Sequence, residues 1–242
     1  MLAILQKELN SFFNSLVGYI VMIVFLTGTG LFMWVFPDTE VLGYGFATME
    51  TLFSMTPFVY LFLIPAITMR TFAEEKKAGT MELLLTRPLT DFQIIIGKYI
   101  ASWLLVIFAL LPTLIYYFSI SALGTPQGNI DTAAVIGSYI GLFLLGAVFT
   151  SIGIFASSIT DNQIVAFILS VFFCFILYTG FSSLAQLDLW EGSAYIVNQL
   201  GIDFHYAAMS KGLIDSRNLL YFFSIITIFL YLTYLNLRSR KW

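Results

Sequence analysis

Six long apolar runs, separated by short polar turns, constrain the fold of this chain more than any other feature. A transmembrane helix needs about 20 consecutive apolar residues to cross a bilayer. The chain is 59% hydrophobic and 10% charged, whereas soluble domains carry about 25% charged residues. The sequence therefore predicts an all-α integral membrane protein with a single transmembrane domain over residues 1–242. The six expected spans are Leu16–Phe36, Leu52–Met69, Ile94–Leu123, Thr132–Ser157, Ile164–Leu184 and Leu219–Leu237.

The distribution of Lys and Arg indicates the orientation of these spans. If the N-terminus is cytoplasmic, that side holds nine basic residues and the other side holds two. The nine are Lys7, Arg70, Lys76, Lys77, Arg87, Lys98, Arg238, Arg240 and Lys241, and the two are Lys211 and Arg217. Cytoplasmic loops of membrane proteins carry the excess of basic residues. We therefore expect a multi-pass protein with both termini in the cytoplasm.

The first fourteen residues are too short to cross a membrane, but they have an amphipathic pattern. One helical face carries Leu2, Leu5, Leu9 and Phe12 or Phe13, and another largely carries Gln6, Lys7, Asn10 and Asn14. This pattern favours a helix that lies in the cytoplasmic interface. The alternative is that these residues begin a long first span.

The segment Arg70–Lys98, between the second and third spans, reads as three helical pieces. The second span continues to Ala78, since Lys76 and Lys77 suit a helix C-terminus and Gly79 is a typical terminator. Thr80 can cap a short helix that has Glu82 in its first turn and ends at Pro88. A third helix opens with a capping box of Thr90 and Gln93, and Leu89 and Ile94 form its hydrophobic staple.

The short helix carries three leucines, Leu83, Leu84 and Leu85, in a loop that faces water. Burying one leucine stabilises by about 1.5–3 kcal/mol, so these side chains are expected to find an apolar contact. They lie either on the lipid interface or in a groove of a cytoplasmic partner. The turn between the fourth and fifth spans repeats the same pattern, with Thr160, Asp161 and Gln163 in the positions of a second capping box.

This loop resembles the cytoplasmic signature of type-2 ABC exporter permeases, which is roughly E-x-x-x-G-T-x-E-x-L-L-x-x-P followed by G-K. The residues that carry the resemblance are Glu74, Glu75, Gly79, Thr80, Glu82, Leu83, Leu84, Leu85, Arg87, Pro88, Gly97 and Lys98. The six spans and the amphipathic start also match, so the resemblance covers the whole chain. It implies a coupling helix that docks on a separate ATP-binding subunit, a second permease subunit, identical or related, and a place in the bacterial inner membrane.

Within that family, three later segments resemble the gliding-motility-associated permease of Bacteroidota. They are Leu110–Tyr117, Gly137–Leu142 and Gly201–Phe222. The resemblance implies a membrane subunit that couples ATP hydrolysis by its partner to the movement of a cargo of unknown identity. The alternative is a membrane anchor or mechanical transmitter of an envelope motility complex that transports nothing.

Several kinds of chemistry are not expected of this chain. Gly97-Lys98 is followed by Tyr99, so there is no phosphate-binding G-x-x-x-x-G-K-[ST] loop, and the chain itself is not expected to be an enzyme. One His and one Cys cannot form a zinc site, so no metal or other cofactor is expected. The net charge of −3 argues against a nucleic-acid partner. Lys98, close to a span end, is expected to extend to the interface, and the absence of other ionisable groups in the spans argues against an ion-coupled carrier.

Two further features have ordinary structural interpretations. Gly137 and Gly141 permit a close helix approach, either within the bundle or at a subunit interface. The external segment from Ala185 to Asn218 is too long for a simple turn and is expected to form short helices at the outer interface, with Trp190 at headgroup level and His205 packed within the loop.

Overall fold

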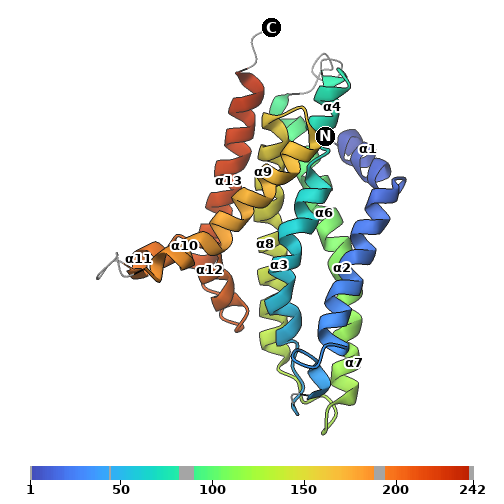
Figure 1. Cartoon of the computed structure of the whole chain (residues 1–242), viewed down its shortest axis with the longest axis vertical. Helices are drawn as coiled ribbons and strands as arrows, with labels where there is room; N and C mark the ends of the chain where they lie inside the picture. Colours follow the sequence, from blue (N-terminus) through green and yellow to red (C-terminus); the bar gives the residue numbers. More distant parts are fainter. Residues whose placement is uncertain (1, 44, 82–89, 188–193, 240–242) are drawn as a thin grey trace.

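The computed structural model describes residues 2–43, 45–81, 90–187 and 194–239. These residues form an elongated bundle of helices whose two chain ends lie at the same end of the molecule (Figure 1). The part of the chain that is described contains no strand, so the expected all-α membrane fold is confirmed.

Five helical stretches among the described residues are long and apolar enough to cross a membrane. The first joins α3 (Glu50–Thr68) to α4 (Ala73–Lys77), and the second joins α6 (Asp91–Leu110), the 3-10 turn η2 (Leu111–Thr113) and α7 (Leu114–Leu123). The others are α8 (Thr132–Ile159), the stretch from α9 (Gln163–Phe175) through the π-helix η3 (Ile176–Gly180) to α10 (Phe181–Ala185), and α13 (Ser216–Arg238). Pro112 interrupts the long third span at η2, because a proline removes a backbone donor from the helix interior.

A sixth span is counted if α1 (Leu2–Phe13) and α2 (Leu16–Trp34) are taken together. The two helices meet at an angle of 69°, so α1 does not simply extend α2. A Cβ atom on Gly18 would lie 2.6 Å from the Phe12 carbonyl oxygen, so only glycine allows this bend. The buried residues of α1 are Ile4 and Phe12, whereas Leu2, which the sequence placed on the apolar face, is exposed.

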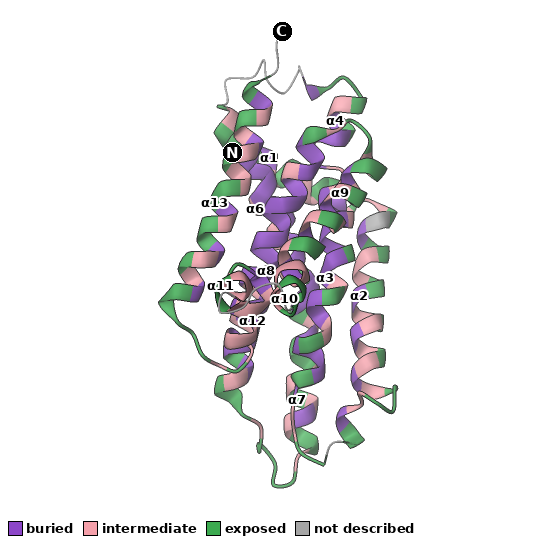
Figure 2. Cartoon of the chain, turned by 60° about the vertical axis from the view of Figure 1, so that its left-hand side comes forward, coloured by how far each residue is buried: buried purple, intermediate pink, exposed green. Residues whose placement is uncertain are grey.

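α8 is the centre of the bundle and packs against α3, α6, α9, α12 (Ile202–Met209) and α13. Buried residues are concentrated along α8 and the helix faces around it (Figure 2). α3 and α8 approach each other closely at Gly153, where an added Cβ atom would lie 2.1 Å from the Thr68 hydroxyl oxygen. The exposed apolar residues lie mainly on α2, α7, α9 and α13, which suits contact with lipid.

The segment after α10 forms short helices, as the sequence predicts. α11 (Ala194–Gln199) lies with α10 in an arm that projects from the side of the bundle, and α12 folds back against α8 (Figure 1). His205 on α12 is buried, lies within hydrogen-bond distance of Asn218 Oδ1 (2.8 Å) and the Gln199 carbonyl oxygen (2.9 Å), and stacks on Tyr221. It therefore packs inside the loop, as expected, while Trp190 lies outside the described residues.

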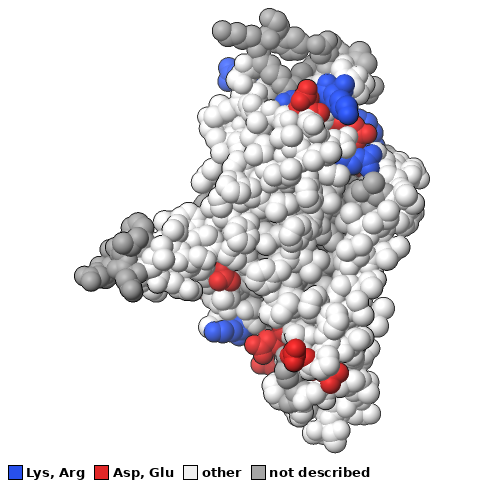
Figure 3. Space-filling model, in the orientation of Figure 1, with Lys and Arg blue, Asp and Glu red and all other residues white. Residues whose placement is uncertain are grey.

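Most charged side chains lie toward the two ends of the bundle, and the visible surface between them is uncharged apart from an acidic patch beside the projecting arm (Figure 3). Lys and Arg gather with a few acidic groups at the end that carries the termini, and acidic side chains predominate over the opposite end. The uncharged belt between them is what a membrane-spanning protein requires.

Candidate coupling site at the terminal end

α4 is a single-turn extension of α3 at the end of the bundle that carries the termini. It stops at Gly79, which has φ +67° and is the left-handed residue of a Schellman motif. The Gly79 amide donates to the Lys76 carbonyl oxygen (3.1 Å) and the Thr80 amide donates to the Glu75 carbonyl oxygen (3.0 Å). The chain therefore leaves α4 in a fixed direction, and Gly79 acts as the terminator that the sequence predicts.

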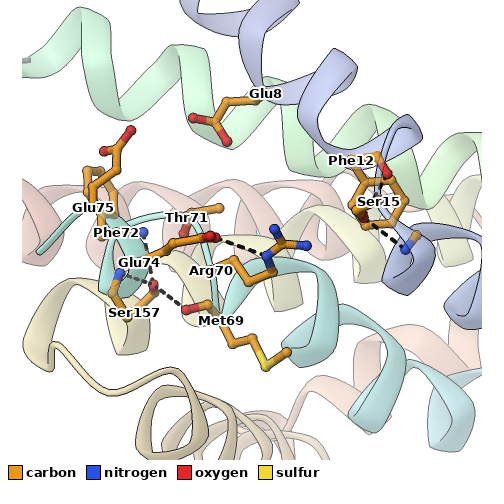
Figure 4. A network of polar contacts seen from close by, with 12 residues as sticks. Glu8, Phe12, Ser15, Met69, Arg70, Thr71, Phe72, Glu74, Glu75 and Ser157 are labelled. Atoms are coloured by element: carbon orange, nitrogen blue, oxygen red, sulfur yellow. Dashed lines mark hydrogen bonds and ion pairs between the residues drawn. The ribbon is translucent and has the colours of Figure 1, made fainter. Parts of the chain in front are cut away.

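Ser157 of α8 fixes the turn between α3 and α4 (Figure 4). Its hydroxyl oxygen accepts from the amides of Phe72 (3.0 Å) and Ala73 (3.1 Å) and donates to the Met69 carbonyl oxygen (3.0 Å). These are backbone groups that the interruption of the helix leaves without intrahelical partners. One buried serine therefore locks α4 onto the end of α8.

Lys98 of α6 is 1% exposed and lies at the centre of a buried charge cluster. Its ammonium donates to Glu8 Oε1 of α1 (2.7 Å) and to the Thr71 carbonyl oxygen (2.6 Å), and it lies 3.0 Å from Glu75 Oε2 of α4. That last contact is an ion pair whose geometry misses a hydrogen bond, and Glu75 Oε2 has no hydrogen-bond partner in the described chain. The expectation that Lys98 extends to the interface is therefore wrong, because two carboxylates and a carbonyl group compensate its charge inside the protein.

Glu75 also pairs with Lys7, whose ammonium lies 2.8 Å from Glu75 Oε1. The neighbouring Glu74 points away from this cluster and pairs with Arg70 at 3.0 Å on a more exposed face (Figure 4). The two adjacent glutamates of the signature thus have different surroundings. Glu75 joins α4 to α1 and α6, and Glu74 makes only a local contact within its own turn.

The loop beyond α4 is described in part. Thr80 donates its hydroxyl to the Glu75 carbonyl oxygen (3.4 Å), and Met81 is buried. The expected short helix with Glu82, Leu83, Leu84, Leu85, Arg87 and Pro88 lies outside the described residues. At the far end of the loop, Thr90 and Gln93 form the expected capping box of α6, while Leu89 of the staple lies outside the description.

The second turn at this end differs from its sequence interpretation. Thr160, Asp161 and Gln163 do not form a capping box, because α9 begins at Gln163 with Asn162 as its N-cap. The Asn162 side chain accepts from the Ile164 amide (2.9 Å), and the Thr160 hydroxyl oxygen accepts from the Asn162 amide (3.1 Å). α8 extends as far as Ile159 with Thr160 as its C-cap, and the N-cap of α9 lies two residues further along the chain than the sequence pattern predicts.

The small residues of α8 lie against the same chain. A Cβ atom on Gly137 would lie 2.7 Å from the Gly212 Cα atom, and one on Gly141 would lie 3.2 Å from the Met209 Cβ atom. The absence of a side chain at both glycines therefore allows α12 and the turn after it to pack closely against α8. Helix packing within one chain therefore explains the presence of Gly137 and Gly141.

Two contributors to the terminal-end network, Glu8 and Ser157, have no local sequence signal. Glu8 belongs to an expected interfacial helix, and Ser157 to the end of an apolar span. Their roles depend on partners 90 and 85 residues away in the chain. The roles of Glu8 and Ser157 become visible only in the folded structure, which shows which helix ends lie next to each other.

The bundle, its uncharged belt and its two charged ends define a multi-pass α-helical membrane protein. The sequence model of the ABC-2 family transporter protein matches residues 2–239, so the chain belongs to that family of ABC transporter permeases. Permeases of this family are membrane subunits that work with a separate ATP-binding subunit. A comparison with curated proteins gives no match.

Proposed function

We propose that this chain is the permease subunit of an ATP-driven exporter, and that the ATP-binding subunit docks against residues 74–88 on the cytoplasmic side. The observation that carries the proposal is the anchoring of α4. It is bonded to α8 through Ser157, to α6 through Lys98 and to α1 through Lys7. A displacement of α4 would therefore act directly on three helices, which is what transfer of motion from a docked ATPase to the spans requires.

The finer parts of the proposal rest on the sequence. The loop between Glu74 and Pro88 resembles the coupling segment of type-2 ABC exporters, and three later segments resemble a gliding-motility permease. We therefore propose a complex of this chain, a second permease subunit and the ATP-binding subunit in the bacterial inner membrane, associated with gliding motility. ATP-driven closure of the ATP-binding subunits would then move the two permeases relative to each other.

The docking role can be tested by placing a charge among the three leucines. Leu84→Asp is expected to lower recovery of the ATP-binding subunit with the tagged permease by tenfold or more, because an unpaired charge in an apolar contact costs roughly several kcal/mol. Leu213→Asp is the matched control, because Leu213 is an exposed leucine in a turn at the opposite end of the bundle. Membranes with equal amounts of permease are compared.

Retention of the partner and of its ATPase activity by Leu84→Asp would place the leucines in lipid and reject the docking role. An equal loss of the ATP-binding subunit with Leu213→Asp would also reject the docking role, because the effect would then not depend on where in the protein the charge is introduced. The permease purified without its partner is expected to hydrolyse no ATP.

A further inference from the structure

A cavity of about 500 Å³ lies near the first turns of α3 and α8, at the opposite ends of these helices from the α4 turn and Ser157. It lies between α3, the start of α8, η3 and α12, all from one chain. Small-molecule sites have volumes of roughly 300–1,000 Å³ and combine apolar walls with a few polar groups. The cavity is therefore large enough for a drug-sized ligand.

Aromatic side chains form one wall of this cavity. The π-helix η3 brings Tyr178 into edge contact with Phe58 of α3, with ring centroids 6.0 Å apart, and to 6.5 Å from Tyr206 of α12. Tyr178 and Tyr206 are buried, whereas Phe58 is half exposed on the side of the bundle. π-helical turns are rare in proteins and are frequent at functional sites.

Hydrogen bonds hold α12 in place across the cavity. The Tyr206 hydroxyl donates to the Phe53 carbonyl oxygen of α3 (2.6 Å), and the Ser138 hydroxyl of α8 donates to the Ser210 carbonyl oxygen (2.9 Å). Both hydroxyl groups therefore donate their hydrogen atoms to backbone carbonyl groups of the same chain and not to a ligand. The lining therefore offers a ligand fewer free donors than acceptors.

The acceptors are carboxylates. Glu50, Asp131 and Asp203 line the cavity, and Lys211 is the one basic residue among the described residues of the lining. In the described part of the chain the Glu50 carboxylate has no hydrogen-bond or ion-pair partner, and Asp203 accepts from the hydroxyl of Ser182 (3.5 Å). The lining thus carries a net negative charge, in line with the acidic side chains at this end in Figure 3.

We propose that this cavity binds an organic cation with an aromatic or otherwise apolar body. Ring faces and carboxylates both attract a positive charge, and the rings also provide an apolar contact for the rest of the ligand. An anionic ligand, including a lipid phosphate, would meet repulsion from three carboxylates. That the cation is a cargo of the exporter rests on the proposed function, whereas its binding to this chain does not.

The test uses two probes of the same shape and opposite charge, tetraphenylphosphonium and tetraphenylborate. Equilibrium dialysis with the full chain, purified in a neutral detergent without its ATP-binding partner, measures binding. Saturable binding of tetraphenylphosphonium, one per chain, is expected, with no competition from tetraphenylborate. Equal binding of both probes, or binding of neither, overturns the proposal, while the docking experiment with Leu84→Asp remains valid.

Carboxylate variants locate the bound cation. Glu50→Gln and Asp203→Asn are each expected to weaken tetraphenylphosphonium binding about tenfold, the loss of one partly screened charge interaction. Asp38→Asn is the matched control, because Asp38 is an exposed carboxylate at the same end that does not line the cavity. The Glu50 carboxylate bonds nothing in the described chain, so the Glu50→Gln variant is expected to fold even where Asp203→Asn does not. Unchanged affinity in Glu50→Gln, or an equal loss in Asp38→Asn, overturns the proposal.

Discussion

At the scale of single residues, the most demanding feature is a buried lysine whose charge is compensated by two largely buried carboxylates. Lys98 is buried with Glu8 and Glu75 around it, so each of the three depends on the others. Burying an ion pair gives little net stability, but removing one partner leaves an uncompensated charge. The terminal end of the bundle should therefore be sensitive to any single change in this cluster.

Lys98→Met is expected to lower the free energy of unfolding by about 3–5 kcal/mol, because it leaves two carboxylates close together without their cation. Arg70→Met breaks the more exposed pair with Glu74 and is expected to cost only about 0–1 kcal/mol. Thermal unfolding of the purified variants in detergent measures both. Equal shifts would show that the cluster around Lys98 is no more important than a surface pair.

The protonation of Asp203 allows cation binding in the cavity to be tested by varying the pH. Burial raises the pKa of this carboxyl group above its usual range, although hydrogen bonds from Tyr178 and Ser182 oppose the shift. Asp203 thus takes up its proton at a higher pH than an ordinary aspartate, and the neutral acid no longer attracts a cation.

The affinity for tetraphenylphosphonium is therefore expected to fall as the pH decreases through the raised pKa of Asp203. Asp203→Asn should remove this step and keep only the dependence that comes from Glu50, Asp131 and Lys211, the other charged groups around the cavity. Dialysis across a pH series measures it. An identical pH profile for both proteins would contradict the role of Asp203.

At the scale of helices, the sequence predicts helix starts and ends correctly where all the interacting residues lie within a single turn. The capping box at Thr90 and the terminator at Gly79 involve residues within three or five positions of each other, so the sequence contains all their partners. The capping box predicted at Thr160 is wrong, because α9 begins only at Gln163 and Asn162 caps it, and the local pattern does not fix where α9 begins. The burial of Lys98 was inaccessible to these rules, because Glu8 lies 90 residues away.

The close contact between α3 and α8 at Gly153 gives a further prediction. Gly153→Ala would place a Cβ atom 2.1 Å from the Thr68 hydroxyl oxygen and 2.8 Å from Thr68 Cβ, so α3 and α8 must move apart. We expect a loss of stability of about 1–3 kcal/mol, as for other overpacked cores. Gly28→Ala in α2 meets nothing within 4 Å and is expected to be neutral or to stabilise. Thermal unfolding that ranks the two variants in the opposite order would contradict this packing.

At the scale of the whole molecule, the charge pattern predicts the topology. Reporters fused after Trp242 or inserted at Lys76–Lys77 are expected to report the cytoplasm, because the basic residues gather at that end. Reporters in the segments Thr125–Asn129 and Asp203–Asp215 are expected to report the opposite side. An external C-terminus would reverse the bundle and place the proposed docking loop out of reach of an ATP-binding subunit.

The two kinds of bond around α4 also differ in stiffness. The three hydrogen bonds of Ser157 are directional and weaken steeply when their geometry changes, so α4 and α8 are joined rigidly. The ion pairs that hold α1 are also hydrogen bonds, but their donors are rotatable ammonium groups on the flexible stems of Lys7 and Lys98, so this joint can shift without breaking. A displacement of α4 would therefore be transmitted almost fully to α8 and only in part to α1. α8 is thus coupled rigidly to α4, whereas α1 is coupled to it flexibly.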